Sequence, residues 1–226
     1  MLSQVGDTSA HRPSASTDTQ AVVYVVDDDI SVRESLEEFI WTVGLQPETF
    51  ASGEEFLRSE RVSRASCLLL DYTLPDLNGL QIQERIADSR PEMPIIFITG
   101  HGDVPTTVKA MKAGAVEFLT KPFNFEVLLS AIKSSIQRSR AALLQEAHRS
   151  ALQHCYQSLS VREREVVELV VRGLLNKRIA AELGISEWTV KVHRGRAMKK
   201  MRADSLAGLV KMTAVCQRGV SLSLLD

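Results

Sequence analysis

The chain has 226 residues, and its 27 basic and 28 acidic side chains give a formal net charge of −1. This length allows one large or two small domains, and no apolar stretch is long enough to predict a membrane-spanning helix. The three cysteines, Cys67, Cys155 and Cys216, lack metal-binding spacing and are typical of thiols in a reducing compartment.

Charge divides the chain into two halves of opposite sign. Residues 1–20 are rich in Ser, Thr, Asp and Ala and lack the apolar core of a signal peptide, so we expect a disordered extension in a cytoplasmic protein. Residues 21–124 carry 17 acidic and 9 basic side chains, a balance of −8. Residues 156–226 carry 13 basic and 7 acidic ones, a balance of +6. This asymmetry indicates a sensor or enzyme module joined to a nucleic-acid-binding module.

From Val22 onwards, short apolar runs alternate with helical patterns. The predicted strands are Val22–Val26, about 46–50, Cys67–Leu70, Ile95–Ile98 and Glu117–Thr120. The predicted helices between them cover about residues 31–43, 53–60, 80–88 and 106–113. Strand–helix alternation of this kind predicts an α/β domain with a doubly wound sheet of five parallel strands.

Polar side chains follow these strands at their carboxyl ends, the edge where open α/β sheets bind ligands. Asp27 and Asp28 close the first strand, Asp71 the third, Thr99 the fourth and Lys121 the fifth. Three adjacent carboxylates need a cation to stay ionised, and a hard divalent ion such as Mg²⁺ suits both them and phosphoryl chemistry. Helix N-caps are the alternative role for aspartates at strand ends, and this role is favoured for Asp29.

The next segment is predicted to be one long helix over residues 125–156, since no Gly or Pro interrupts the chain from Phe125 to Gly173. We divide the chain into a domain over 21–137, a helical linker over 138–157 and a small all-α domain over 158–226. In the last of these, Ser160 and Glu163 form a capping box, and Asn176 and Ser186 are expected to cap the next two helices. The short helix, the turn at Gly184 and the longer basic helix predict a helix-turn-helix.

A helical wheel over residues 187–201 separates two faces. Val190, Ala197 and Met201 share the face expected to pack on the domain, with His193 at its edge as a structural histidine. The opposite face is expected to contact DNA through Trp188, Lys191, Val192, Gly195, Arg196 and Lys199. It combines donors for base edges and phosphates with apolar surface for thymine methyl groups. An ordinary solvated basic face would explain the lysines, but not Trp188 and Val192.

Taken together, these motifs resemble a known family. Residues 22–136 are similar to a response-regulator receiver domain, through Val-Val-Asp-Asp-Asp29, Leu-Leu-Leu-Asp-Tyr-Thr-Leu-Pro-Asp-Leu-Asn-Gly79, Phe-Ile-Thr-Gly-His-Gly-Asp-Val-Pro105 and Phe-Leu-Thr-Lys-Pro122. Residues 158–215 resemble a LuxR-type helix-turn-helix, through Leu-Ser-Val-Arg-Glu-Arg-Glu165, Asn-Lys-Arg-Ile-Ala180 and Thr-Val-Lys-Val-His193. The combination is most similar to the FixJ/NarL type.

The resemblance implies that Asp71 takes a phosphoryl group from a phosphohistidine of a sensor histidine kinase. Asp27, Asp28, Asp71 and the Thr73 carbonyl would hold Mg²⁺, with Lys121 beside them. Thr99 and Phe118 would switch conformation, and the Lys121–Pro122 bond would be cis.

The implied partners are promoter DNA, a second copy of the phosphorylated chain, and RNA polymerase if the protein is an activator. No membrane partner is expected. The implied protein is not an enzyme, beyond promoting its own phosphorylation and dephosphorylation.

Two alternatives remain at this stage. One is a transcriptional regulator that works without phosphorylation. The other is a phosphatase of the haloacid-dehalogenase type, which also forms an aspartyl phosphate. That phosphatase would need a second aspartate two residues after the nucleophile, where this chain has Thr73.

Overall fold

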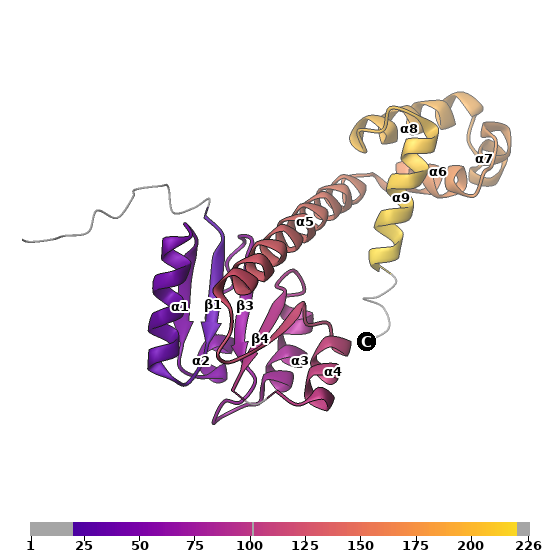
Figure 1. The fold of residues 1–226 in the computed structure, drawn as a ribbon. Helices are drawn as coiled ribbons and strands as arrows, with labels where there is room; N and C mark the ends of the chain where they lie inside the picture. Colours follow the sequence, from indigo (N-terminus) through magenta and orange to yellow (C-terminus); the bar gives the residue numbers. More distant parts are fainter. Residues whose placement is uncertain (1–19, 101, 221–226) are drawn as a thin grey trace, which may run out of the picture. The chain divides into compact units, whose positions relative to one another are not determined.

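The computed structural model describes residues 20–100 and 102–220 (Figure 1), so the predicted extension over residues 1–20 lies almost wholly outside the described part. The described residues fall into two compact units, divided between Leu143 and Leu144, which are considered separately below. Helix α5 (Phe125–Gln157) contributes residues to both units.

The first unit is built on a parallel sheet of five strands in the order β2-β1-β3-β4-β5. The strands are β1 (Val22–Val26), β2 (Gln46–Phe50), β3 (Ser66–Asp71), β4 (Ile95–Thr99) and β5 (Glu117–Thr120). Every residue of β1, β3 and β4 is buried, as the continuous apolar runs predict for strands covered on both faces. The predicted doubly wound α/β fold is confirmed.

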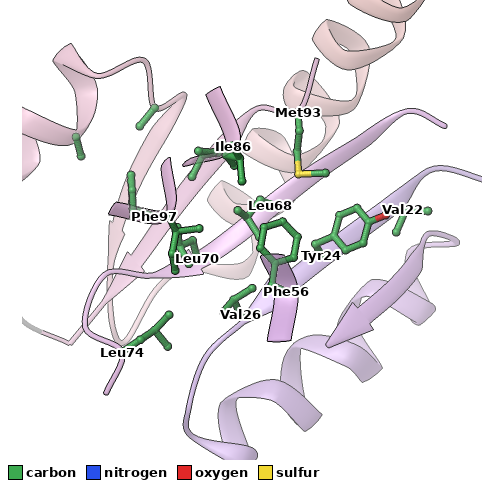
Figure 2. Close-up of a cluster of buried hydrophobic side chains, with 14 residues drawn as sticks. Val22, Tyr24, Val26, Phe56, Leu68, Leu70, Leu74, Ile86, Met93 and Phe97 are labelled. Carbon is green, nitrogen blue, oxygen red and sulfur yellow. The ribbon is translucent and has the colours of Figure 1, made fainter. Parts of the chain in front are cut away.

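Successive side chains of each central strand point to opposite faces of the sheet and pack into two separate cores. The helices of this unit are α1 (Ile30–Thr42), α2 (Gly53–Arg58), α3 (Gly79–Ser89), α4 (Val104–Lys112) and the first part of α5. Figure 2 shows the core in which Tyr24 of β1 packs with Phe56 of α2 and Ile86 of α3. On the other face, Val23 packs with residues of α1 and α5, including Ile132. With both faces covered, the ends of the strands remain as the place for a site.

The second unit contains helices only. The end of α5 is followed by α6 (Val161–Val171), α7 (Asn176–Leu183), α8 (Glu187–Lys200) and α9 (Leu206–Val220). Their core includes Val166, Ile179, Val190 and Leu209, all 0% exposed, and Leu152 from α5 joins it. The predicted all-α unit joined through a helical segment is confirmed.

Local capping explains most of the helix boundaries in this unit. The predicted capping box is present: Ser160 Oγ accepts the N–H of Glu163, whose carboxylate accepts the N–H of Ser160. Gly184 ends α7 in the left-handed conformation with φ of 64°, which glycine adopts without strain. The prediction that Asn176 caps α7 is wrong. Leu175 is the N-cap, without a side-chain bond, and the Asn176 side chain instead accepts a hydrogen bond from Arg194 of α8 at 3.2 Å.

Candidate phosphoryl-acceptor site and DNA-binding surface

The carboxyl ends of β1, β3 and β5 bring two carboxylates and one ammonium together. Lys121, directly after β5, places Nζ 2.6 Å from Asp27 Oδ2 and 2.7 Å from Asp71 Oδ2. Asp27 and Asp71 are buried, with 2% and 6% of their surface exposed. Burial raises the pKa of Asp27, although hydrogen bonds from Lys121 and Asp29 oppose the rise. Burial alone would lower the pKa of Lys121, but the two carboxylates outweigh it and raise that pKa.

A third carboxylate, from the exposed Asp28, completes the acidic group. One oxygen from each of Asp27, Asp28 and Asp71 lies within 4.8 Å of the others. Three hard, charged oxygen donors at this spacing fit a divalent cation such as Mg²⁺. The neighbouring Asp29 has a different role, since its carboxylate accepts the N–H of Ser31 at 2.8 Å as the N-cap of α1. The helix-cap interpretation of Asp29 is confirmed.

The loop after β3 holds Asp71 from its other side. The N–H of Thr73 donates to Asp71 Oδ1 at 2.8 Å, so the two carboxylate oxygens of Asp71 have different partners. Thr73 also forms a β-bridge with Asn78, the N-cap of α3. The next residue, Gly79, is closely enclosed: a Cβ there would lie 2.5 Å from a ring carbon of Phe97 and 3.3 Å from the Asp71 carbonyl oxygen. The loop therefore requires glycine at this position.

Thr99 and Phe118 lie on the two strands at the β4–β5 side of the sheet. Thr99 ends β4, is 0% exposed, and its carbonyl accepts the N–H of Lys121 at 2.7 Å. The Phe118 ring is partly buried against the core, with its centroid 6.0 Å from that of Phe97 and 6.4 Å from that of Tyr72. Thr99 is thus directly linked through its backbone to the residue that bridges Asp27 and Asp71. The peptide bond between Lys121 and Pro122 is cis, as the resemblance implies.

Sequence reasoning missed one residue of this site, Arg33. Its Nη1 donates to the backbone carbonyls of Asp27 at 2.7 Å and Asp28 at 2.9 Å. The available signal was a basic residue one turn into the helix that directly follows the paired aspartates.

Helix α8 of the second unit presents the two faces that the wheel predicts. Val190 and Ala197 are 0% exposed and Met201 is 1% exposed, so this face packs into the core. The exposed residues of the predicted DNA-contacting set are Trp188, Lys191, Gly195, Arg196 and Lys199, whereas Val192 is half-buried, as is His193. A Cβ on Gly195 would meet nothing within 4 Å, so packing within the domain does not require glycine there.

The far end of α8 is tied to the start of the domain. Lys200 Nζ lies 2.6 Å from Glu163 Oε2 and 3.1 Å from the Ser158 carbonyl oxygen. Glu163 is 4% exposed, and burial would raise its pKa. Its hydrogen bonds from Lys200 and Ser160 outweigh burial and lower that pKa. The ammonium of Lys200 therefore connects α8 both to the capping box of α6 and to the turn that follows α5.

Comparisons with known proteins agree with both units. Residues 23–133 match the response regulator receiver domain, and residues 157–213 match the luxR family of bacterial regulatory proteins. Nodulation protein W of Bradyrhizobium diazoefficiens is 50% identical over 197 residues, covering 86% of each chain. Response regulator protein TodT of Pseudomonas putida (strain F1) is 45% identical over 202 residues, covering 87% of each chain.

Solved structures give the same result. The response regulator StyR superposes with a TM-score of 0.77 at 44% identity, covering 87% of this chain and 99% of StyR. Full-length FixJ from B. japonicum superposes with a TM-score of 0.51 at 37% identity, covering 88% of this chain and 98% of that one.

A five-stranded parallel sheet with an acidic edge, followed by a helix-turn-helix unit, defines a two-domain regulatory protein. The chain belongs to the transcriptional response regulators, which join a receiver domain to a LuxR-type DNA-binding domain. Within the described residues, no helix combines the length and the hydropathy needed to cross a bilayer.

Proposed function

We propose that Asp71 accepts a phosphoryl group from a phosphohistidine of a sensor histidine kinase, and that phosphorylation controls promoter binding through α8. The observation that carries this proposal is the ammonium of Lys121, held 2.6 and 2.7 Å from the buried carboxylates of Asp27 and Asp71. A half-buried cation beside a buried carboxylate nucleophile supplies the positioning and charge stabilisation that phosphoryl transfer needs.

In the transfer step, an Asp71 carboxylate oxygen forms the new bond to phosphorus. The bond between phosphorus and the histidine nitrogen breaks, and its electron pair stays on the imidazole. Lys121 stabilises negative charge on the phosphoryl oxygens, and the N–H of Thr73 orients Asp71 from the opposite side. The carboxylates of Asp27, Asp28 and Asp71, with the Thr73 carbonyl, would hold Mg²⁺, which lowers the charge barrier to the approach of the phosphoryl group.

Two residues respond to the new charge at Asp71: Thr99, at the end of β4, and Phe118, in β5. The Thr99 hydroxyl bonds a phosphoryl oxygen and draws its loop inwards, and Phe118 turns into the space released. The Thr99 carbonyl already accepts the N–H of Lys121. Thr99 and Lys121 therefore move together at this edge of the sheet. The receiver then has two states, and phosphorylation shifts their populations.

The output of this shift is DNA binding by the second unit. The exposed face of α8 combines three cations, Lys191, Arg196 and Lys199, with the indole of Trp188, which is 73% exposed. These groups suit phosphates, base edges and thymine methyl groups in the major groove. The phosphorylated protein acts as a homodimer in the cytoplasm, and as an activator it would contact RNA polymerase.

The test uses the full-length chain with acetyl phosphate as phosphodonor. We expect Mg²⁺-dependent, acid-stable and base-labile phosphoryl incorporation that excess chelator stops, and a phosphorylation-dependent footprint on promoter fragments. Asp71→Asn should abolish both. Asp29→Asn is the matched control, because asparagine also caps helices well and Asp29 lies outside the acidic group.

Three results would overturn the proposal. Label that persists on the Asp71→Asn chain would mean that the nucleophile is a different residue. A footprint that is identical with and without phosphodonor would identify a regulator that works without phosphorylation. Repeated turnover of a phosphate ester by the chain would instead indicate the phosphatase alternative.

A further inference from the structure

Arg33 braces the turn that carries the paired aspartates. Its Nη1 donates to the carbonyl oxygens of Asp27 and Asp28, at 2.7 and 2.9 Å, and its backbone N–H donates to the carbonyl of Asp29 at 3.1 Å. One residue thus holds three consecutive carbonyl groups. Hydrogen bonds from a guanidinium are charge-assisted and about twice as strong as neutral ones, so this turn is firmly oriented.

The carboxylates of Asp27 and Asp28 depend to different extents on these hydrogen bonds from Arg33 for their positions. The Asp27 carboxylate has further partners, because it accepts the N–H of Asp29 at 3.0 Å and the ammonium of Lys121. The Asp28 side chain is exposed, and within the described parts of the chain no hydrogen bond or ion pair holds its carboxylate. Its place within 4.8 Å of the other two carboxylates is therefore set mainly by the backbone that Arg33 holds.

We propose that Arg33 is a positioning residue of the acidic site, which orients Asp28 for a divalent cation through the Asp27 and Asp28 carbonyls. The three carboxylates and Lys121 together carry a charge of −2, and Arg33 adds a second positive charge beside them. This inference rests on the proposed phosphoryl transfer to Asp71, since Mg²⁺ serves that reaction. Residues that orient metal ligands typically change metal affinity about 10–100-fold when removed. The lower end of this range applies here, because Arg33 bonds the backbone and not the carboxylates.

The experiment compares the full-length wild-type chain with three variants by Mg²⁺ titration, followed by the amide shift of Thr73, which donates to Asp71. Arg33→Met keeps the aliphatic stem but removes the donors, and Arg33→Lys restores a cationic donor. Arg58→Ala removes an exposed arginine of α2, whose partner among the described residues is Glu54, and so controls for loss of charge. Acetyl phosphate labelling is measured in parallel, because this donor needs no docking to a kinase.

We expect Arg33→Met to weaken Mg²⁺ binding about 10-fold and to slow labelling at subsaturating Mg²⁺, with saturating Mg²⁺ restoring most of the rate. Arg33→Lys should recover most of the affinity, and Arg58→Ala should bind as wild type does. A merely structural brace would lower the unfolding free energy without changing the Mg²⁺ dissociation constant.

The inference is wrong if Arg33→Met binds Mg²⁺ as tightly as the wild type, or if Arg33→Lys is as weak as Arg33→Met. It is also wrong if Arg58→Ala weakens binding equally, since the effect would then be one of net charge. In each of these cases wild-type labelling at Asp71 persists, and the proposed function stands. A wild-type chain that neither binds Mg²⁺ nor takes up label overturns the proposed function and this inference together.

Discussion

Replacing Lys121 by methionine should destabilise the receiver domain and make its stability strongly dependent on Mg²⁺. The change leaves Asp27 and Asp71, 2% and 6% exposed, without their shared cation, and makes the charge of the site more negative, from −2 to −3. Breaking a buried ion pair costs about 3–5 kcal/mol. The Lys121 side chain is 22% exposed, so water screens part of this cost, and we expect a loss of about 2–3 kcal/mol.

Divalent cation should recover much of this loss. For an assumed dissociation constant of about 1 mM, binding at about 10 mM Mg²⁺ would stabilise the wild type by about 1.4 kcal/mol. Without the competing ammonium, the carboxylates of the variant should bind Mg²⁺ more tightly. A 10-fold lower dissociation constant would raise the stabilisation to about 2.7 kcal/mol. Mg²⁺ should therefore restore about 1.3 kcal/mol more to Lys121→Met than to the wild type.

The assay is urea unfolding of the full-length chain, with and without Mg²⁺, followed by a probe in the receiver domain. Lys109→Met is the control, because Lys109 is an exposed lysine of α4 and its loss changes the net charge equally. A Lys121→Met chain as stable as the control without Mg²⁺ would refute the reasoning. The reasoning would also be refuted if Mg²⁺ raised the unfolding free energy of Lys121→Met by no more than that of the wild type.

Three further changes test other parts of the structure. Gly79→Ala should lower receiver stability by about 1–3 kcal/mol in thermal unfolding, because the new Cβ would lie 2.5 Å from the buried Phe97 ring; an unchanged melting temperature would contradict this close packing. Glu163 has a lowered pKa, so its contribution to DNA-binding-domain stability is present above the unfolded-state value of 4.5 and is lost as pH falls through the lower folded-state value. Unfolding measured between pH 7 and pH 3 should therefore show a smaller acid loss for Glu163→Gln than for the wild type, and equal losses would show that the bond to Lys200 contributes nothing. Val190→Asp should unfold the second unit by burying an unpaired charge at a position that is 0% exposed, and a cooperative melt at the wild-type temperature would mean that this face of α8 is misassigned.

Much of this protein could be predicted from local patterns. The apolar runs Val22–Val26 and Ile95–Ile98 form buried strands, since only a strand covered on both faces can bury every side chain. The capping box of Ser160 and Glu163 forms as predicted, because its hydrogen bonds join residues three apart in sequence. The inward face of α8 follows from helical periodicity in the same way. These features depend on interactions within a few residues, so the local order of side chains predicts them.

The tertiary structure decided the contacts that join distant segments. Lys121 lies 94 residues from Asp27 and 50 from Asp71, and only the strand order 2-1-3-4-5 brings its ammonium between their carboxylates. The sequence placed these residues at one edge of the sheet, but not in direct contact. Asn176 forms a bond to Arg194 rather than the predicted cap, because α7 packs against α8 and offers the side chain a partner from outside its own helix. The partner of each of these side chains depends on which surfaces of the domain pack together, and no local sequence pattern specifies that.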